Sequence, residues 1–188
     1  MALPAPYVTA PLESLKTMLG NDPWGHLENL RSDDLVLIAT FIQTFNFIEL
    51  NLRRSVSSFV RAGLIPNKKR IASSDLVDMS VSAVSRMDPA IEDVADTVGR
   101  LNELEFRRPY RNLFAHWATK RIRGHDALYL MSHDSNDTKR AMIGEIDCGS
   151  AGFAILLLPD VRGLVQHIGQ YESWLARKTA DWHMRYGG

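Results

Sequence analysis

Apolar residues recur at helical spacing through much of the chain, and the longest such stretch follows Ser32. Ser32, Asp33 and Asp34 provide the oxygen atoms and negative charge that favour a helix start. The helical spacing then continues to Gly63, a residue type common at helix ends. The apolar stripe consists of Leu35, Ile38, Ile42, Phe45, Leu52, Val56 and Phe59. Because further apolar residues widen this stripe, we predict a long helix at the centre of the fold.

The same spacing predicts three more helices. A short one follows Ser73, and a longer one begins at Pro89 and extends to about Arg121. The last one follows Asp160. Pro109 lies inside the longer helix, where it removes a backbone donor and crowds the preceding turn. We therefore expect a kink or a break at Pro109.

Strand patterns occur between the last two predicted helices. Asp126–His133, Lys139–Ile146 and Phe153–Leu158 show strand-like composition, with a turn-forming Asp134–Asp137 between the first two. The predicted fold is therefore mainly α, a four-helix bundle with a small antiparallel β-sheet insert at about residues 126–158, before the C-terminal helix. A chain of 188 residues without a long linker is expected to form one domain, residues 1–188.

Composition narrows the class of protein. The formal net charge is zero, which argues against broad non-specific nucleic-acid binding, and we interpret Lys68–Arg70 and Lys139–Arg140 as solvated surface charge. The single Cys148 and the lack of zinc-type spacing suggest no disulfide, metal or cofactor. Met1–Pro11 lacks a signal-peptide pattern, and the apolar runs are short or interrupted. We expect a cytoplasmic protein with no membrane partner.

The segment after Pro109 combines aromatic and catalytic-type side chains. At roughly 100° per residue, Arg108, Asn112 and His116 form one stripe, with Arg111 at its edge. The opposite side carries Phe106, Tyr110, Leu113, Phe114 and Trp117. The polar stripe continues the apolar face of the preceding turns, so either Pro109 rotates the segment or a second subunit covers it across a two-fold axis. Arg111 and His116 lie about 140° apart, so two copies would make a more compact site than one.

Arg111-Asn112-Leu113-Phe114-Ala115-His116 resembles the RNxxxH signature of HEPN domains. These are all-helical dimeric domains of prokaryotic toxin and antiviral defence systems, and many are metal-independent RNA endonucleases. The resemblance covers the motif and a helical frame, residues 32–123 and 160–182, and the predicted strands depart from the all-helical pattern. It implies an RNA substrate, a homodimer, and an antitoxin or regulatory protein as a further partner.

The resemblance implies catalytic roles for Arg111, Asn112 and His116. A histidine can take the proton of a ribose 2′-hydroxyl or give one to the leaving 5′-oxygen, and an arginine can grip the phosphate bidentately. Asn112 would orient the phosphate or the imidazole. The products would be a 2′,3′-cyclic phosphate and a 5′-hydroxyl. Without a catalytic role, His116 would pack at a helix interface, and Arg111 would pair with Glu105 or Asp126.

Other residues near the motif are candidates for substrate binding or support. Arg107, Arg108, Lys120 and Arg121 would contact RNA phosphates, unless the first two are solvated and the last two complement a helix C-terminus. Glu49 lies on the apolar stripe with Asn46 nearby, where it either pairs with Arg53 or faces the Arg111 and His116 cluster.

Two functions remain from these observations. The first is a homodimeric HEPN-like endoribonuclease with a composite site. The second is a non-catalytic HEPN-like module that uses the same face for dimerisation or for binding RNA or protein. A third interpretation, an unrelated helical scaffold with a chance motif, would require His116 to be buried away from Arg111 and from any cleft.

Overall fold

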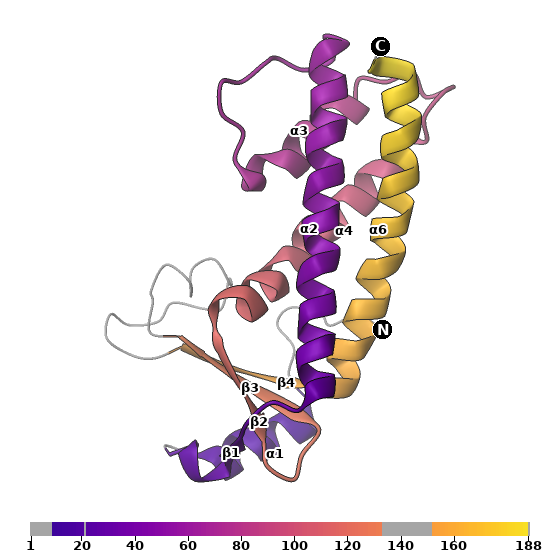
Figure 1. The fold of residues 1–188 in the computed structure, drawn as a ribbon. Coiled ribbons are helices and arrows are strands. Elements are labelled where there is room, and N and C mark those ends of the chain that lie inside the picture. Colours follow the sequence, from indigo (N-terminus) through magenta and orange to yellow (C-terminus); the bar gives the residue numbers. More distant parts are fainter. Residues whose placement is uncertain (1–8, 21, 133–151, 188) are drawn as a thin grey trace. The chain divides into compact units, whose positions relative to one another are not determined.

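The computed structural model describes residues 9–20, 22–132 and 152–187, which are mainly helical (Figure 1). These residues form five α-helices: α1 (Ala10–Leu19), α2 (Ser32–Arg61), α3 (Leu76–Val84), α4 (Val94–His116) and α6 (Leu158–Tyr186). They also form one four-stranded sheet: β1 (Leu27–Glu28), β2 (Ala118–Ile122), β3 (Ala127–Ser132) and β4 (Gly152–Leu157). Contacts divide them into two compact units. The first contains the described residues up to 42 and within 109–167, and the second contains residues 43–108 and 168–187.

The sheet belongs to the first unit. Its strands follow the order β1-β2-β3-β4, and every neighbouring pair is antiparallel. Gly124, with φ of 75°, adopts the left-handed conformation that the short turn between β2 and β3 requires. One sheet face packs against α1 (Figure 1). The buried residues of this cluster are Leu15, Leu19, Leu27, Ile122, Ala127 and Tyr129.

The opposite sheet face points toward the helices of the first unit. Successive strand residues point to opposite faces of the sheet, so Arg121 lies on the face opposite to that of Ile122. Its guanidinium binds Asp34 in the first turn of α2. Leu128 pairs with Arg121 across the sheet and is fully buried. Among these helices, Phe41 of α2 packs edge to face against Phe114 of α4, with ring centroids 5.6 Å apart.

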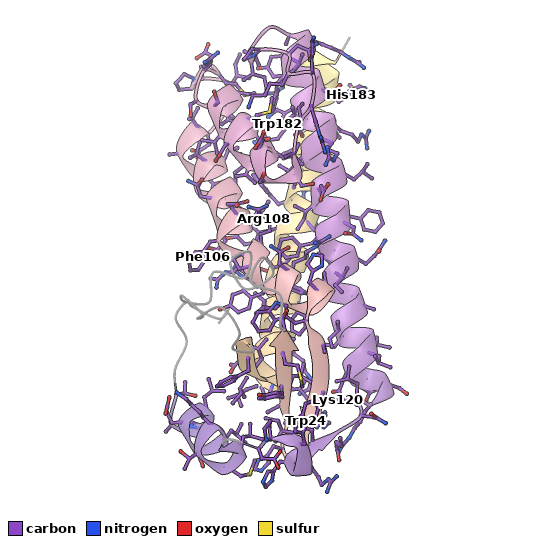
Figure 2. All side chains as sticks on the ribbon, turned by 90° about the vertical axis from the view of Figure 1, so that its left-hand side faces the viewer. Trp24, Phe106, Arg108, Lys120, Trp182 and His183 are labelled. Carbon is purple, nitrogen blue, oxygen red and sulfur yellow. The ribbon has the colours of Figure 1, made fainter. Side chains whose placement is uncertain are left out.

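The second unit is helical in its described residues. It contains the later turns of α2, the short α3 and most of α4, together with the end of α6. Trp182 of α6 is fully buried against Phe59 of α2, with ring centroids 5.1 Å apart (Figure 2). Glu92, just before α4, accepts hydrogen bonds from Trp182, Lys178 and Thr97. This carboxylate therefore ties the start of α4 to the last turns of α6.

Three of the predicted helices are present in the structure. The first runs from Ser32 to Arg61 as α2. Gly63 ends it in the left-handed conformation, with φ of 71°, and the Leu64 amide donates back to the Phe59 carbonyl. The predicted C-terminal helix is α6, and the predicted short helix after Ser73 begins with one 3-10 turn and continues as α3.

The predicted helix from Pro89 to Arg121 is wrong at both ends. Asp88 and the next four residues form turns, and α4 begins at Val94, where the Asp93 carboxylate accepts the Asp96 amide. The helix continues through Pro109 without the break that we considered. It ends at His116, and residues 118–122 form β2 instead of a last helical turn.

Strands β3 and β4 confirm two of the three predicted strands. The third, Lys139–Ile146, lies outside the described residues, as does the turn before it. The sheet also includes β1, and helix α1 precedes it; the pattern of residues predicted neither element.

Helix α2 is also long and apolar enough to cross a membrane, judged by length and composition alone. The mean hydropathy of its most apolar 18-residue window is 1.5, and a third of that window is buried. Core helices of soluble proteins pass the same test, so a soluble protein is compatible with this helix.

Candidate functional site

The last two turns of α4 carry the candidate catalytic residues. Arg111, Asn112 and His116 all follow Pro109 and belong to the first unit. Arg111 and Asn112 are half-buried, and His116 is exposed at the helix end.

The opposite side of these turns is anchored in the core. Tyr110, Leu113, Phe114 and Trp117 are all at most 8% exposed. The Trp117 amide still donates to the Leu113 carbonyl at 2.9 Å, although Trp117 itself lies beyond the helix. This packing fixes the rotation of the helix end, so the polar residues keep one orientation without binding each other strongly.

Arg111 and His116 have few partners among the described residues. The Arg111 Nη1 atom donates to Asn112 Oδ1 over 3.4 Å, a long hydrogen bond. Within the described part of the chain, the His116 ring makes no hydrogen bond or ion pair. An exposed imidazole of this kind can exchange a proton with a ligand. The adjacent Trp117 Nε1 is a buried donor that finds no acceptor among the described residues.

The two carboxylates considered as partners of Arg111 bind other arginines instead. Glu105 pairs with Arg108, and Asp126 pairs with Arg121. Arg111 is therefore not neutralised by either of them. Its guanidinium retains donors for an anionic ligand.

Arg107 and Arg108 precede Pro109 and belong to the second unit (Figure 2). Arg107 is 8% exposed, and its Nε atom donates to Glu103 at 2.8 Å. Its Nη1 atom is buried with no acceptor among the described residues. Arg108 is half-buried and paired with Glu105, so of the two it is the one that a phosphate can reach.

Arg121 is the centre of a buried ion cluster. It is 4% exposed, and its guanidinium contacts Asp34 at 2.7 Å, Asp126, and Glu28 at 3.7 Å. Burial acts to lower the pKa of Arg121, but its hydrogen bonds to Asp34 and Asp126 outweigh burial and raise it. Arg121 is therefore engaged inside the first unit. We had proposed it as a phosphate contact because we placed it on the exposed end of a helix.

Lys120 lies beside Arg121 on β2, and because successive strand residues alternate it points to the other sheet face. It is half-buried, and its Nζ atom donates to Asn29 Oδ1 at 2.7 Å. That bond joins the segment after β1 to β2 and leaves the charge of Lys120 without a carboxylate partner in the described residues.

Glu49 and Asn46 lie on α2, in the second unit. Glu49 accepts hydrogen bonds from Arg53 at 2.7 Å and from Ser73 at 2.8 Å. The alternative pairing of Glu49 with Arg53 is thus present. Asn46 is exposed and donates to Gln43 at 3.5 Å.

Asp34 makes two structural contacts, and the sequence pattern predicted only the one at the start of α2. We interpreted it as part of a helix start, and its Oδ2 does accept the Arg31 amide at 3.0 Å. Its other oxygen binds Arg121, 87 residues later in the chain. No local spacing could reveal that contact, because it depends on the strand pairing of β1 and β2.

Fold and site together define a mainly helical protein with a small antiparallel sheet and an Arg-Asn-His cluster on one helix end. In the described residues, no group of three or more His, Cys, Asp or Glu side chains is placed to hold a metal ion. No protein-family model, curated protein or solved structure matches the chain. The resemblance to HEPN domains therefore stays a prediction from the motif of Arg111, Asn112 and His116.

Proposed function

We propose that the protein is a homodimeric, metal-independent endoribonuclease of a prokaryotic toxin or antiviral defence type. The observation that carries this proposal is the exposed His116, which has no partner among the described residues and lies one turn after Asn112, beside an Arg111 with unused donors. These groups are held by a buried aromatic side of the same helix. The helices α2, α3, α4 and α6 would correspond to a HEPN-like four-helix frame, with the sheet as an addition.

The reaction needs only a base, an acid and a stabilised phosphate. One imidazole removes the proton of a ribose 2′-hydroxyl, and the 2′-oxygen attacks the adjacent phosphorus. The bond from phosphorus to the 5′-oxygen breaks, and that oxygen takes a proton from a second imidazole. Arg111 stabilises the negative charge that grows on the phosphorane oxygens. The products are a 2′,3′-cyclic phosphate and a 5′-hydroxyl.

A dimer would bring to one phosphate the catalytic groups that a single chain cannot place together. His116 and Arg111 are separated by about 140° around α4, so they cannot both face one phosphate squarely from a single helix. Two copies across a two-fold axis would provide two imidazoles and two guanidiniums in one cleft. Arg108 and Lys120 are the remaining candidate phosphate contacts, because Arg107 and Arg121 are buried in ion pairs.

The test is cleavage of mixed cellular RNA by the purified protein in the presence of EDTA. We expect His116→Ala and Arg111→Ala each to reduce cleavage at least about a hundredfold, the usual range for a lost general acid or base. His125→Ala is the matched control, because His125 is another exposed histidine of the first unit and should leave cleavage unchanged. Light scattering should give a dimer for all four proteins.

Equal cleavage by all four proteins would refute the assigned site, and cleavage that requires a metal ion would refute the mechanism. The burial of Arg107 and Arg121 reduces the cations available to RNA and favours a second candidate, a non-catalytic module that binds RNA or a protein such as an antitoxin. That candidate predicts no cleavage by the wild-type protein, together with loss of dimer or of RNA binding in the Arg111 variant.

A further inference from the structure

The second unit contains a pocket that the proposed ribonuclease site does not use. It has a volume of about 360 Å³ and lies between α2, the loop that follows it and the start of α3. Its polar lining comes from Arg53, Ser57, Arg61 and Asn67. Its apolar floor comes from Val56, Val60, Ile71 and Leu76, of which the half-buried Val60 and Ile71 present surface to the pocket. The pocket thus combines cations with an apolar surface.

The segment that lines this pocket is rich in positive charge, with Glu49 and Asp75 just outside its two ends. Residues 50–74 contain six Lys or Arg residues and no Asp or Glu, although the whole chain has a formal net charge of zero. An acid-free segment of this length creates a local positive potential that a balanced total charge conceals. The charges of residues 68–70, which we interpreted as solvated surface, belong to this segment.

Several of these cations are not neutralised. Lys69 and Arg70 do not line the pocket themselves but lie on its loop, between the lining residues Asn67 and Ile71; both are exposed and have no hydrogen-bond or ion-pair partner in the described residues. Lys68 lies 3.7 Å from Asp75, a loose ion pair at the surface. The Arg61 Nη1 atom donates to the Gly187 carbonyl at 3.2 Å, a bond that leaves its positive charge uncompensated.

Arg53 has a structural role in the same pocket. Its guanidinium binds Glu49, the Ser73 hydroxyl and the Ile71 carbonyl, so it fastens the loop to α2 and shapes one wall. The ligand charge must therefore be met by Arg61 and the unpaired loop cations. Ser57 and Asn67 add hydrogen-bonding groups on the remaining sides.

We propose that this pocket binds a nucleotide, with the phosphate held by Arg61 and the loop cations and the base or ribose resting on the apolar floor. A pocket of this size exceeds what a lone phosphate needs and lies within the range of small-molecule sites. The cations select a phosphorylated ligand, since guanidinium groups bind phosphate oxygens in bidentate geometry. A free mononucleotide and a nucleotide within an RNA chain share this chemistry.

Calorimetric titration of the full-length protein tests the proposal with four 5′-monophosphates, the four nucleosides, inorganic phosphate and a short single-stranded RNA. We expect at least one monophosphate to bind roughly tenfold more tightly than both its nucleoside and inorganic phosphate. Arg61→Gln and the double variant Lys69→Gln with Arg70→Gln should each weaken that binding by roughly tenfold, the loss expected for a charge-assisted contact. Lys16→Gln with Arg162→Gln is the charge-matched control, because both are exposed outside the pocket, and it should bind as the wild type does.

A free nucleotide is the ligand if the monophosphate binds more tightly than the RNA, and an RNA chain is the ligand if the order is reversed. Either order supports a nucleotide site, provided that the pocket variants alone weaken binding. Failure of every phosphorylated probe to bind, or equal weakening in the control variant, would overturn the proposal. The readout is binding and not cleavage, so its failure is distinct from failure of the ribonuclease proposal.

Discussion

Each unit of the protein buries charged side chains, and Arg121 in the first unit and Glu92 in the second are compensated in opposite ways. In the first unit the cation Arg121 is surrounded by carboxylates, which raise its pKa in spite of burial. In the second unit the carboxylate of Glu92 is surrounded by donors. Burial acts to raise the pKa of Glu92, but hydrogen bonds from Lys178, Thr97 and Trp182 lower it overall. Both charges are thereby stabilised in the folded state.

The charges assigned to function lack this compensation. His116 has no partner in the described residues, Arg111 has one long hydrogen bond, and Lys69 and Arg70 have none. Buried charged groups that bind groups of opposite charge or hydrogen-bond donors hold a fold together, whereas exposed groups without partners remain available to a ligand. The variants below test this division by their effect on the free energy of unfolding.

The largest effect is expected at Arg121. Arg121→Ala leaves the buried carboxylate of Asp34 without its cation and should lower the free energy of unfolding by about 3–5 kcal/mol. Lys120→Ala, one position earlier, removes one hydrogen bond at a partly exposed side chain and should cost about 1 kcal/mol. Urea denaturation followed by circular dichroism measures both. Equal losses in the two variants would show that the ion cluster does not stabilise the first unit.

A smaller loss is expected at Glu92. Glu92→Gln removes the charge that binds Lys178 and should lower the free energy of unfolding by about 1–3 kcal/mol at pH 7. Asp181→Asn, an exposed carboxylate on the same helix as Trp182, is the control and should change it by less than about 0.5 kcal/mol.

The pH dependence follows from the lowered pKa of Glu92. The stabilising contribution of a carboxylate with a lowered pKa is complete above its ordinary value, here 4.5, and is lost as the pH falls toward the lower folded-state pKa. The difference between wild type and Glu92→Gln should therefore shrink as the pH falls below 4.5. A constant difference down to pH 3 would contradict this role of the charge.

Local sequence signals predicted the long helices. They failed for segments whose structure depends on pairing with residues that are distant in the chain. Helix α2 has a capping segment, an apolar stripe and a terminal glycine within one stretch of chain, so its limits could be predicted from the sequence alone. Residues 118–122 contain Ala, Lys and Arg, which favour helix, yet they form β2 because Thr119 pairs with Leu130 and Lys120 with Tyr129. Strand β1 has only two residues and exists through its pairing with β2.

The same distinction applies to the candidate site. The stripe of Asn112 and His116 and its aromatic opposite side followed from helical spacing, because α4 is continuous there. The structural role of Arg121 did not follow from helical spacing, because Arg121 lies on a strand whose alternation directs its side chain to Asp34. Helix α1 could have been predicted, since Pro11 lies in its first turn and Leu12, Leu15 and Leu19 repeat at helical spacing.

Almost no change in stability is expected at His116. Because the imidazole is exposed and unpartnered, His116→Ala should alter the free energy of unfolding by less than about 0.5 kcal/mol. The same variant should abolish RNA cleavage, so stability and activity separate at this residue. Thermal unfolding at one protein concentration measures the stability. A loss above about 1 kcal/mol would place His116 among the structural residues instead.

The smallest effect has the opposite sign. Lys69→Gln with Arg70→Gln removes two cations from an acid-free segment, so the repulsion among the remaining charges falls and the free energy of unfolding should rise by a few tenths of a kcal/mol, at roughly 0.01 M salt. The gain should vanish at about 0.5 M salt, where the Debye length is only a few ångströms. Lys16→Gln with Arg162→Gln makes the same change in net charge away from this segment and should show a smaller gain. Urea denaturation at the two salt concentrations compares the pairs, and a loss of stability in the first pair would mean that Lys69 and Arg70 are compensated after all.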